Sequence, residues 1–270
     1  MTTPILIPSR GRAHMFARDF CTIKQMDDET HKNVYYFVPR EEQAAYFLRA
    51  PKNVNIVPVG PYPETISLKR KLMANWAQEF GFKRFFMFDD DLRWSVRKIS
   101  DAAGLRLSDC YDISRMLNRM ETMMLTKGYA VVGVSMRQGN NTIGMGDEKN
   151  LYEENVRICR AGLFDTEKFL SVKHDRLRFL GDFDVLLQLL EAGHKIASTF
   201  YWAQDQPQTQ HPGGCTIFRN HETHLEAVKG LQALHPDVVS LVEKTNKTGG
   251  EFGKRTEVRI QWKKAYKPPV

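Results

Sequence analysis

The sequence has few cysteines, no long hydrophobic run and none of the common glycine-rich nucleotide motifs. Its four cysteines, Cys21, Cys110, Cys159 and Cys215, are far apart and include no CxxC pair. This spacing argues against a zinc knuckle and against a disulfide framework. It is typical of a protein that works in a reducing cytoplasm, so a cytoplasmic location is expected.

The sequence also lacks a membrane-spanning segment and the common nucleotide-binding motifs, and both absences exclude classes of function. No run approaches the ~18 apolar residues of a membrane span, and residues 1–4 lead directly into a short strand rather than a signal peptide. We therefore expect no association with membranes. Neither GxGxxG nor GxxxxGK[ST] occurs, which argues against the familiar dinucleotide-binding and kinase-type sites.

The chain carries an excess of positive charge, which is concentrated near the C-terminus. The 270 residues include 39 Lys and Arg against 32 Asp and Glu, a net charge of +7, which predicts attraction to polyanions. From residue 244 onward only Glu251 and Glu257 oppose the basic residues Lys244, Lys247, Lys254, Arg255, Arg259, Lys263, Lys264 and Lys267. With glycines at 249, 250 and 253, this pattern predicts a flexible basic arm that contacts nucleic acid. Improved solubility is the alternative explanation.

Strand and helix patterns alternate through the first third of the chain. We predict strands at 4–8, 34–39, 55–59 and 85–88, and helical segments at 15–25, 41–48 and 66–80, with Gly81 ending the last helix. This alternation predicts an α/β fold with a mostly parallel, Rossmann-like central sheet flanked by helices.

The pattern is looser in the rest of the chain. We predict a methionine-rich core helix at 113–127, a strand at 129–135, an active-site loop at 137–150 and a helix at 185–192 that ends at Gly193. A boundary near residue 205 would separate a core at 1–205 from a C-terminal segment at 206–270. The alternative is a single domain with a loop at Gly213 and Gly214.

Three consecutive aspartates, Asp89, Asp90 and Asp91, directly follow the apolar run at 85–88. Clustered carboxylates repel one another and resist desolvation, whereas a divalent cation would reverse that cost. In an extended backbone alternate side chains share a face, so Asp89 and Asp91 are predicted to hold one ion while Asp90 points elsewhere. The alternative is that Asp91 caps a following helix and the other two aspartates are solvated.

Basic residues are predicted near the same edge of the sheet. The turn at 9–12 places Arg10 and Arg12 after the first strand, where guanidinium groups and a helix N-terminus favour phosphate. Lys69 and Arg70 lie on the helix that precedes the aspartates. We expect part of this group to face the same cleft, although an ordinary surface turn with two arginines is the alternative.

A second acidic pair, Asp182 and Asp184, precedes the helix predicted at 185–192. Asp182 lies between apolar residues, which favours a raised pKa and a role as general base. Either residue could instead cap the helix, and Asp184 is the stronger candidate for a cap. His211, followed by Pro212 and two glycines, is a candidate third ligand for the ion held by Asp89 and Asp91.

Taken together, these segments resemble a GT-A glycosyltransferase. The resemblance rests on IPSRGR at 7–12, on FMFDDDL at 86–92 as the DxD motif, and on FLGDFDVLLQLLEAG at 179–193. With Tyr201-Trp202-Ala203, HPGGC at 211–215 and the basic C-terminus, the chain more narrowly resembles the phage TET/JBP-associated DNA glycosyltransferases. It departs from the family pattern at Gly181, where an acidic residue is expected before the base.

The resemblance implies a set of site residues. Asp89, Asp91 and His211 would hold Mn²⁺ or Mg²⁺ against the diphosphate of a UDP-sugar, and Asp182 would be the catalytic base. The donor would be bound by Pro8, Ser9, Arg10, Arg12, Lys69, Arg70 and Asp90. The acceptor would be 5-hydroxymethylcytosine in phage DNA, contacted by Tyr201, Trp202, Gly213, Gly214, Lys254, Arg255 and Lys263. The sugar would be glucose or arabinose, the location would be the host cytoplasm, and no protein partner is inferred.

Three alternatives remain open from the sequence. A sugar-phosphate nucleotidylyltransferase uses related metal–diphosphate chemistry, but IPSRGR is a poor version of its glycine-rich signature. A metal-dependent nuclease also uses clustered aspartates, and a non-catalytic DNA-binding protein would account for the basic C-terminus. Binding of UDP in the presence and absence of Mn²⁺ distinguishes the glycosyltransferase from these alternatives.

Overall fold

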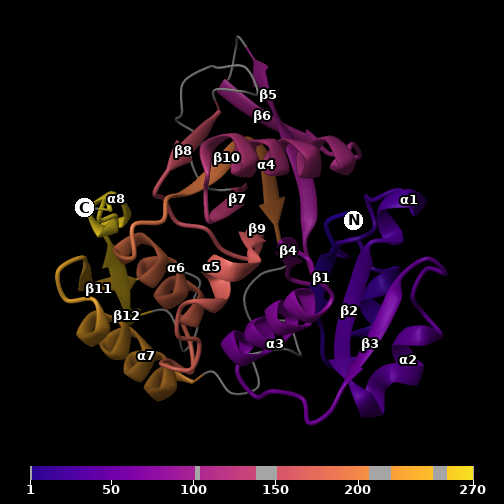
Figure 1. Cartoon of the computed structure of the whole chain (residues 1–270), viewed down its shortest axis with the longest axis horizontal. Helices are drawn as coiled ribbons and strands as arrows, with labels where there is room; N and C mark the ends of the chain where they lie inside the picture. Colours follow the sequence, from indigo (N-terminus) through magenta and orange to yellow (C-terminus); the bar gives the residue numbers. More distant parts are fainter. Residues whose placement is uncertain (1, 101–103, 138–150, 207–219, 246–253, 270) are drawn as a thin grey trace.

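The computed structural model describes residues 2–100, 104–137, 151–206, 220–245 and 254–269. A ten-stranded sheet forms the centre of the protein (Figure 1). In spatial order its strands are β3 (Asn55–Val59), β2 (Val34–Pro39), β1 (Ile5–Pro8), β4 (Arg84–Phe88), β9 (Ala161–Asp165), β7 (Val131–Met136), β10 (Ile196–Asp205), β5 (Arg93–Ser100) and β6 (Gly104–Asp109). The tenth strand, β8 (Tyr152–Glu154), pairs with β10.

The strand directions follow from the pairings. Strand β1 is parallel to β2 and β4, β2 is parallel to β3, and β10 is parallel to β7. Strand β9 is antiparallel to both β4 and β7, and β5 is antiparallel to both β10 and β6. Seven of the ten strands therefore share one direction, and β5, β8 and β9 run the other way. The predicted α/β fold class is confirmed.

Strand β4 sends alternate side chains to opposite faces of the sheet, as an extended backbone requires. Phe86 and Phe88 join the apolar cluster beneath α4 (Ile113–Lys127), whereas Phe85 and Met87 join the cluster beneath α3 (Ile66–Glu79). The predicted core role of the α4 methionines is confirmed, because four of them are buried: Met116, Met120, Met123 and Met124.

Local signals in the sequence explain where these two helices begin and end. The side chains of Thr65 and Asp112 accept hydrogen bonds from the first turns of α3 and α4. Gly81 and Gly128 follow the two helices with φ of 77° and 69°, which glycine adopts without strain. The short α2 (Gln43–Phe47) lies within the predicted segment 41–48. None of the described helices has both the length and the apolar character that a bilayer crossing requires.

The helix predicted at 15–25 is wrong. The described structure has a 3-10 turn at Ala13–Ala17 and a short α1 at Asp28–His31. Between them, the Thr22 hydroxyl donates to the Asp89 carbonyl at 2.5 Å and accepts from the Leu92 amide at 3.0 Å. The Gln25 side chain bonds to both backbone groups of Trp94. These residues stabilise the turn that follows β4 through hydrogen bonds. The apolar spacing in this segment therefore does not indicate a helix.

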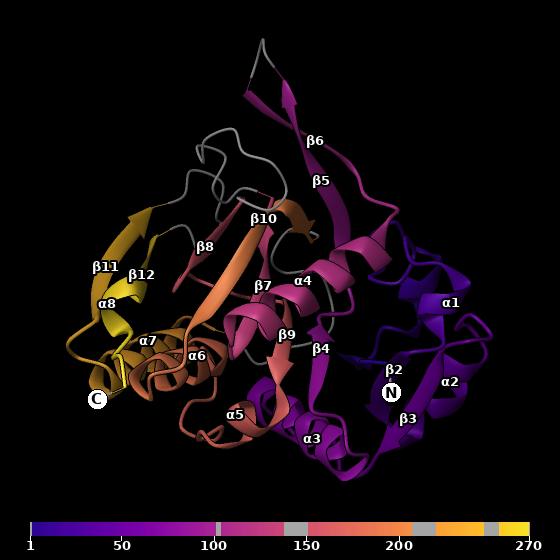
Figure 2. The same ribbon diagram turned by 45° about the horizontal axis from the view of Figure 1, so that its top comes forward.

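The hairpin of β5 and β6 is a second feature that the sequence analysis did not predict. It projects away from the body of the molecule in both views (Figures 1 and 2). At its base Arg93 pairs with Asp109 at 2.7 Å, and the buried Arg97 donates to the carbonyls of Phe200 and Trp202 in β10. The hairpin is thereby fixed to the central sheet.

The last part of the chain forms a compact unit, consisting of α7 (His221–Leu234), β11 (Val239–Thr245), β12 (Lys254–Ile260) and α8 (Trp262–Ala265). We call these elements the C-terminal unit. From residue 254 onward the prediction of a flexible basic arm is wrong, because β12 pairs with β11 over its whole length and Ala265 is buried in the core cluster beneath α3. The unit packs on α6 (Gly181–Glu191), where the rings of Phe183 and Trp262 lie 5.6 Å apart.

Candidate active site

The three aspartates after β4 form a turn rather than an extension of the strand. Strand β4 ends at Phe88 and β5 begins at Arg93, and we call Asp89–Asp91 the acidic turn. The expected extended backbone at these residues is therefore wrong. The alternative in which Asp91 caps a helix is also wrong, because a strand follows. The acidic turn lies at the carboxyl end of β4, the edge where open α/β sheets bind ligands.

Asp90 anchors the acidic turn to the segment after β1. It is only 5% exposed, and it accepts hydrogen bonds from the hydroxyl of Ser9 and from Nη1 of Arg12, the latter at 2.7 Å. The same Arg12 nitrogen lies 2.9 Å from a carboxylate oxygen of Asp91. Burial raises the pKa of Asp90, although Arg12 and Ser9 oppose that rise. Two predicted donor-binding residues therefore meet the acidic turn directly.

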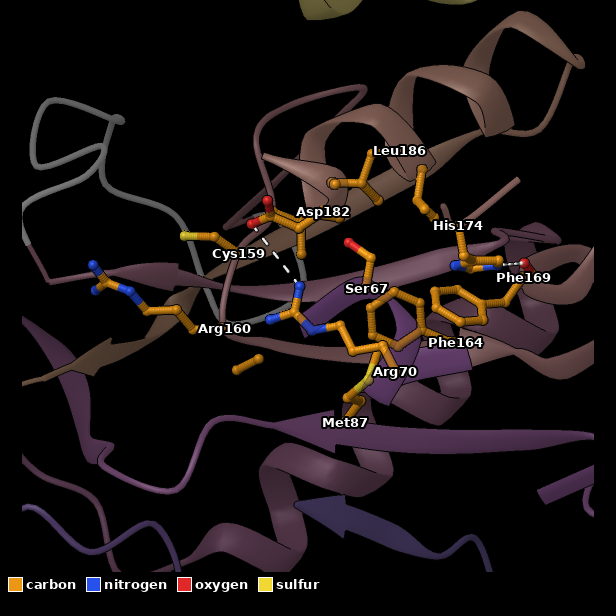
Figure 3. Close-up of a pocket in the computed structure, with 14 residues that line it drawn as sticks. Ser67, Arg70, Met87, Cys159, Arg160, Phe164, Phe169, His174, Asp182 and Leu186 are labelled. Atoms are coloured by element: carbon orange, nitrogen blue, oxygen red, sulfur yellow. Dashed lines mark hydrogen bonds and ion pairs between the residues drawn. The ribbon is translucent and has the colours of Figure 1, made fainter. Parts of the chain in front are cut away.

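Arg70 of α3 connects the acidic turn with the second acidic pair. Its Nη2 donates to Asp89 at 3.2 Å, and its Nη1 lies 4.0 Å from Oδ2 of Asp182 (Figure 3). Burial raises the pKa of Asp89, Arg70 opposes that rise and the charge of Asp91 adds to it. The structure thus brings the predicted metal-binding residue and the predicted base to opposite sides of one guanidinium.

Helix α6 begins earlier than predicted, at Gly181, so Asp182 and Asp184 lie inside its first turns. Neither residue caps the helix, because the N-cap position is occupied by Leu180, which makes no side-chain cap bond. Gly181 packs against α3, where an added Cβ would lie 1.9 Å from the hydroxyl oxygen of Ser67. This contact explains why glycine replaces the acidic residue that the family pattern leads one to expect.

Asp184 is a buried structural residue. Its carboxylate accepts from Nε of Arg176 at 3.1 Å and lies 2.9 Å from Nε2 of His235. Burial alone would raise the pKa of Asp184, but the hydrogen bonds from His235 and Arg176 outweigh burial and lower it. Of the two aspartates only Asp182, which is partly exposed, remains available to a substrate.

A mostly apolar pocket opens beside Arg70 and Asp182, between α3, β9 and α6 (Figure 3). Arg160 lies on its wall with φ of 68°, a left-handed conformation that is uncommon outside glycine. The Arg160 carbonyl accepts from the amide of Asp89 at 2.8 Å, and its guanidinium makes no ion pair with a carboxylate in the described parts of the chain. The sequence analysis missed Arg160, for which the only signal is its position before the unassigned strand β9.

The remaining predicted donor residues surround the ends of β1 and α3. Pro8 is buried in β1 and Arg10 is exposed in the turn that follows. Lys69 is buried, with its Nζ 4.8 Å from the ring centre of Tyr62. The Tyr62 hydroxyl donates to the carbonyls of Ser9 and Phe37, each at 3.1 Å, and so ties the ends of β1 and β2 together.

The predicted acceptor residues are dispersed. Trp202 is 2% exposed and lies in the core, so the prediction that it contacts the acceptor is wrong, whereas Tyr201 is half-buried. Arg255 pairs with Glu257 in β12, and the exposed Lys263 of α8 pairs with Glu153 of β8. Lys254 is the first residue of β12.

Part of the predicted site cannot be compared with the structure. His211, Gly213 and Gly214 lie outside the described residues, as does most of the loop predicted at 137–150. Within the described ranges, no group of three or more His, Cys, Asp or Glu side chains is arranged to hold a metal ion. The metal prediction therefore depends on Asp89 and Asp91 together with a third ligand from elsewhere.

The fold resembles those of solved glycosyltransferase structures. S. aureus TarS (residues 1–349) in complex with UDP matches with a TM-score of 0.51 and 11% identity, over 87% of this chain and 65% of that one. The TarS complex with UDP-GlcNAc matches with a TM-score of 0.50 over 87% and 66%. A mycobacterial protein matches with a TM-score of 0.54 and 9% identity, over 96% and 84%. At these identities the likeness shows a shared GT-A-like fold.

The family is shown by the sequence itself. A search of curated proteins gives no match. The family model for TET-Associated Glycosyltransferase matches residues 3–214, which include every strand from β1 to β10 and the whole of α6. The expectation of a glycosyltransferase is therefore confirmed, and the chain belongs to the TET-associated glycosyltransferase family.

Proposed function

We propose that the protein transfers a sugar, glucose or arabinose, from a UDP-sugar to the hydroxymethyl group of 5-hydroxymethylcytosine in phage DNA. One observation carries the proposal: Arg70 contacts Asp89 at 3.2 Å and lies 4.0 Å from Asp182. A donor held at the acidic turn would therefore have a carboxylate base close to its reacting end.

The proposed donor is a UDP-sugar because TarS, which shares the fold, has been solved with UDP and with UDP-GlcNAc. Guanidinium groups bind phosphate with paired donors, and Arg12, Arg70 and Arg160 lie around the acidic turn. Arg160 is the candidate for the diphosphate, since its charge acts on both Asp89 and Asp91 and it forms no close ion pair with a carboxylate in the described residues. Pro8, Ser9, Arg10, Lys69 and Asp90 are the proposed contacts to the nucleoside and the sugar.

The carboxylates of the acidic turn are the proposed site for a divalent cation. Burial raises the pKa values of Asp89 and Asp91, and each of these carboxylates also faces a neighbouring aspartate, so a cation would relieve a real electrostatic cost. Asp89, Asp91 and His211 are the proposed ligands for Mn²⁺ or Mg²⁺. When bound, the ion supplies Lewis-acid stabilisation of the leaving diphosphate.

Asp182 is the proposed general base. It takes the proton of the acceptor hydroxyl while the hydroxyl oxygen forms a bond to the anomeric carbon and the bond from that carbon to the diphosphate breaks. A direct displacement of this kind inverts the configuration of the anomeric carbon. Arg70, whose Nη1 lies 4.0 Å from Asp182, is proposed to hold this carboxylate beside the acidic turn.

The proposed acceptor is DNA. A base inside a duplex cannot reach a recessed site, so the hydroxymethylated base would be flipped out. Residues 1–205 form the proposed core that binds the nucleotide sugar and the metal, and residues 206–270 are proposed to complete the active site and to contact DNA. Tyr201, Gly213 and Gly214 are the proposed contacts to the base, and Lys254, Arg255 and Lys263 those to the DNA backbone. Backbone contacts of this kind make affinity fall steeply with salt.

Mass spectrometry of nucleosides tests the proposal directly. Hydroxymethylated DNA is incubated with the protein, Mn²⁺ and one of several UDP-sugars, and is then digested to nucleosides. The expected result is a 5-hydroxymethylcytosine nucleoside heavier by one sugar residue, with no product from unmodified DNA. A sugar found only on another acceptor would overturn the DNA assignment.

Thermal unfolding separates this proposal from the nearest rival chemistry. We expect UDP to raise the melting temperature, and to raise it more when Mn²⁺ is present. A nucleotidylyltransferase would instead be stabilised best by a nucleoside triphosphate, and a nuclease would be insensitive to UDP. Either of those outcomes would contradict the proposed donor.

A further inference from the structure

A buried group of charged side chains joins the C-terminal unit to α6. We call Arg176, Asp184, Glu191 and His235 the charge cluster. Nε2 of His235 lies 2.9 Å from Oδ1 of Asp184, and its Nδ1 lies 2.8 Å from Oε1 of Glu191. The His235 side chain, which follows α7, is 0% exposed. Two carboxylates of α6 are thus bridged by one ring from the C-terminal unit.

This geometry requires a charged imidazolium. A neutral imidazole carries one N–H, so one ring nitrogen would present its lone pair to a carboxylate oxygen. Arg176 is the other charged group that faces the ring: its Nη2 lies 3.3 Å from Nε2, farther than the Asp184 oxygen, and it also donates to that oxygen. Burial alone would lower the pKa of His235, but the hydrogen bonds with Asp184 and Glu191 outweigh burial and raise it.

The charge cluster lies next to a strained turn. Leu180, directly before Gly181 and Asp182, has φ of 60°, and such a conformation persists only where the surroundings hold it. Arg176 binds the segment before Leu180 to Asp184. The Gln188 side chain reinforces this connection, because it bonds to Asp184 at 3.1 Å and to the Lys173 carbonyl at 2.8 Å.

We propose that His235, as the imidazolium, is a positioning residue for sugar transfer: it fastens the C-terminal unit to α6 and thereby keeps Asp182 opposite Arg70. The inference rests on the proposed function, since it takes Asp182 as the base. His235 lies beyond residue 214, where the match to the family model ends. A segment outside that match therefore controls the geometry of the reacting site.

The charge state is measured without any activity assay. Long-range ¹H–¹⁵N NMR of histidine-labelled protein at pH 7 is expected to show both ring nitrogens of His235 protonated. The pKa of His235 lies above its unfolded value, so its contribution is complete below about pH 6.5 and is lost as the pH rises through the folded-state pKa. A neutral His235 at pH 7 would overturn the inference.

Kinetics then test the positioning role. Glu191→Gln removes one of the carboxylates that raise the pKa, so the alkaline fall in kcat is expected at lower pH than in wild type. At pH values well above both folded-state pKa values, a displacement of about one pH unit lowers kcat about tenfold, with kcat at pH 6 and the Kd for UDP unchanged. An alkaline fall that coincides with that of wild type would overturn the inference.

His224→Gln is the matched control. His224 is also a buried histidine of α7, but its Nε2 faces the Thr256 carbonyl at 3.1 Å, within the C-terminal unit. We expect this variant to be less stable than wild type, with the alkaline fall in kcat at the same pH as in wild type. If Asp182→Asn retained transfer, the assignment of Asp182 as the base would fail, and with it the positioning role of His235. If the wild-type protein transferred no sugar, the proposed function would fail, whereas the charge state of His235 is reported separately by the NMR measurement.

Discussion

The acidic turn after β4 and the first turns of α6 have similar arrangements of carboxylates but differ in the roles of those carboxylates. Each has one buried aspartate held by an arginine, namely Asp90 with Arg12 and Asp184 with Arg176. Each also has one partly exposed aspartate near Arg70. The buried member fixes the backbone, and the more accessible member is the carboxylate that we propose binds a ligand.

The two regions differ in their electrostatic balance. In the acidic turn burial prevails over the arginines, so the pKa values of Asp89, Asp90 and Asp91 are raised. At Asp184 the hydrogen bonds from His235 and Arg176 prevail over burial, and the pKa is lowered. Ionised carboxylates therefore cost stability in the acidic turn and contribute stability in α6. The second region is a fixed scaffold, and the first is where we propose that a cation binds.

Asp182→Asn is expected to have the largest effect, because it removes the exposed carboxylate of α6. Loss of a general base lowers the rate by about 100- to 10,000-fold. The amide keeps the size of the side chain, so UDP binding by calorimetry should equal that of wild type. A variant that transfers sugar at the normal rate would refute the role of Asp182.

Asp184→Asn removes the buried carboxylate of the pair formed by Asp182 and Asp184. Removing one partner from a buried ion pair costs about 3–5 kcal/mol, because Arg176 and His235 keep their charge without its counterpart. We expect this loss in urea unfolding at pH 7. Asp184 stabilises the fold above its unfolded pKa of about 3.9, and this stabilisation is lost as the pH falls through the lower folded-state pKa. The difference from wild type should therefore shrink in acid. Asp182→Asn, as the control, should stay within about 0.5 kcal/mol of wild type.

Gly181→Ala tests how closely α6 must approach α3. The new Cβ would lie 1.9 Å from the Ser67 hydroxyl oxygen and 3.0 Å from its Cβ. Overpacking of this kind costs about 1–3 kcal/mol. The double variant Ser67→Ala with Gly181→Ala, which removes the hydroxyl oxygen at 1.9 Å, should recover both melting temperature and transfer relative to Gly181→Ala. Equal losses in the single and double variants would show that the clash is not the cause.

Asp89→Asn is expected to have the smallest effect and the opposite sign. Because the folded-state pKa of Asp89 is raised, its ionised form destabilises the metal-free fold above that pKa, and the penalty is absent below about pH 3.9. The variant should therefore melt slightly higher than wild type at pH 7 without divalent ions, and at the same temperature near pH 3. Added Mn²⁺ should stabilise only the wild type. A lower melting temperature at pH 7 would contradict this balance.

The sequence predicted the parallel half of the fold because its strands and helices carry local signals. The run at 85–88 and the glycines after α3 and α4 place these elements correctly. The same reasoning failed for residues 15–25, whose Thr22 and Gln25 bond to residues about 70 positions away. The prediction from sequence also failed for the C-terminal unit, because the many basic residues in this segment suggested an exposed arm although its apolar side chains pack on α6.

The candidate site could be predicted only in part, for a similar reason. The spacing of the aspartates indicated which carboxylates come together, but their partners depend on the tertiary fold. Arg160 is identified by its backbone conformation and its contact with Asp89. His235 had no local signal that distinguished it from the other histidines, since its partners lie 44 and 51 residues away.

The contact between Gly181 and Ser67 also limits how this active site can evolve. An added Cβ at position 181 would lie 1.9 Å from the Ser67 hydroxyl oxygen, so a larger residue there requires Ser67 to rotate or to lose its hydroxyl group. Replacement of Ser67 by alanine removes that oxygen and leaves only the 3.0 Å contact with its Cβ. A change at position 181 is therefore easiest after a change at position 67, and the two positions are expected to change as a pair.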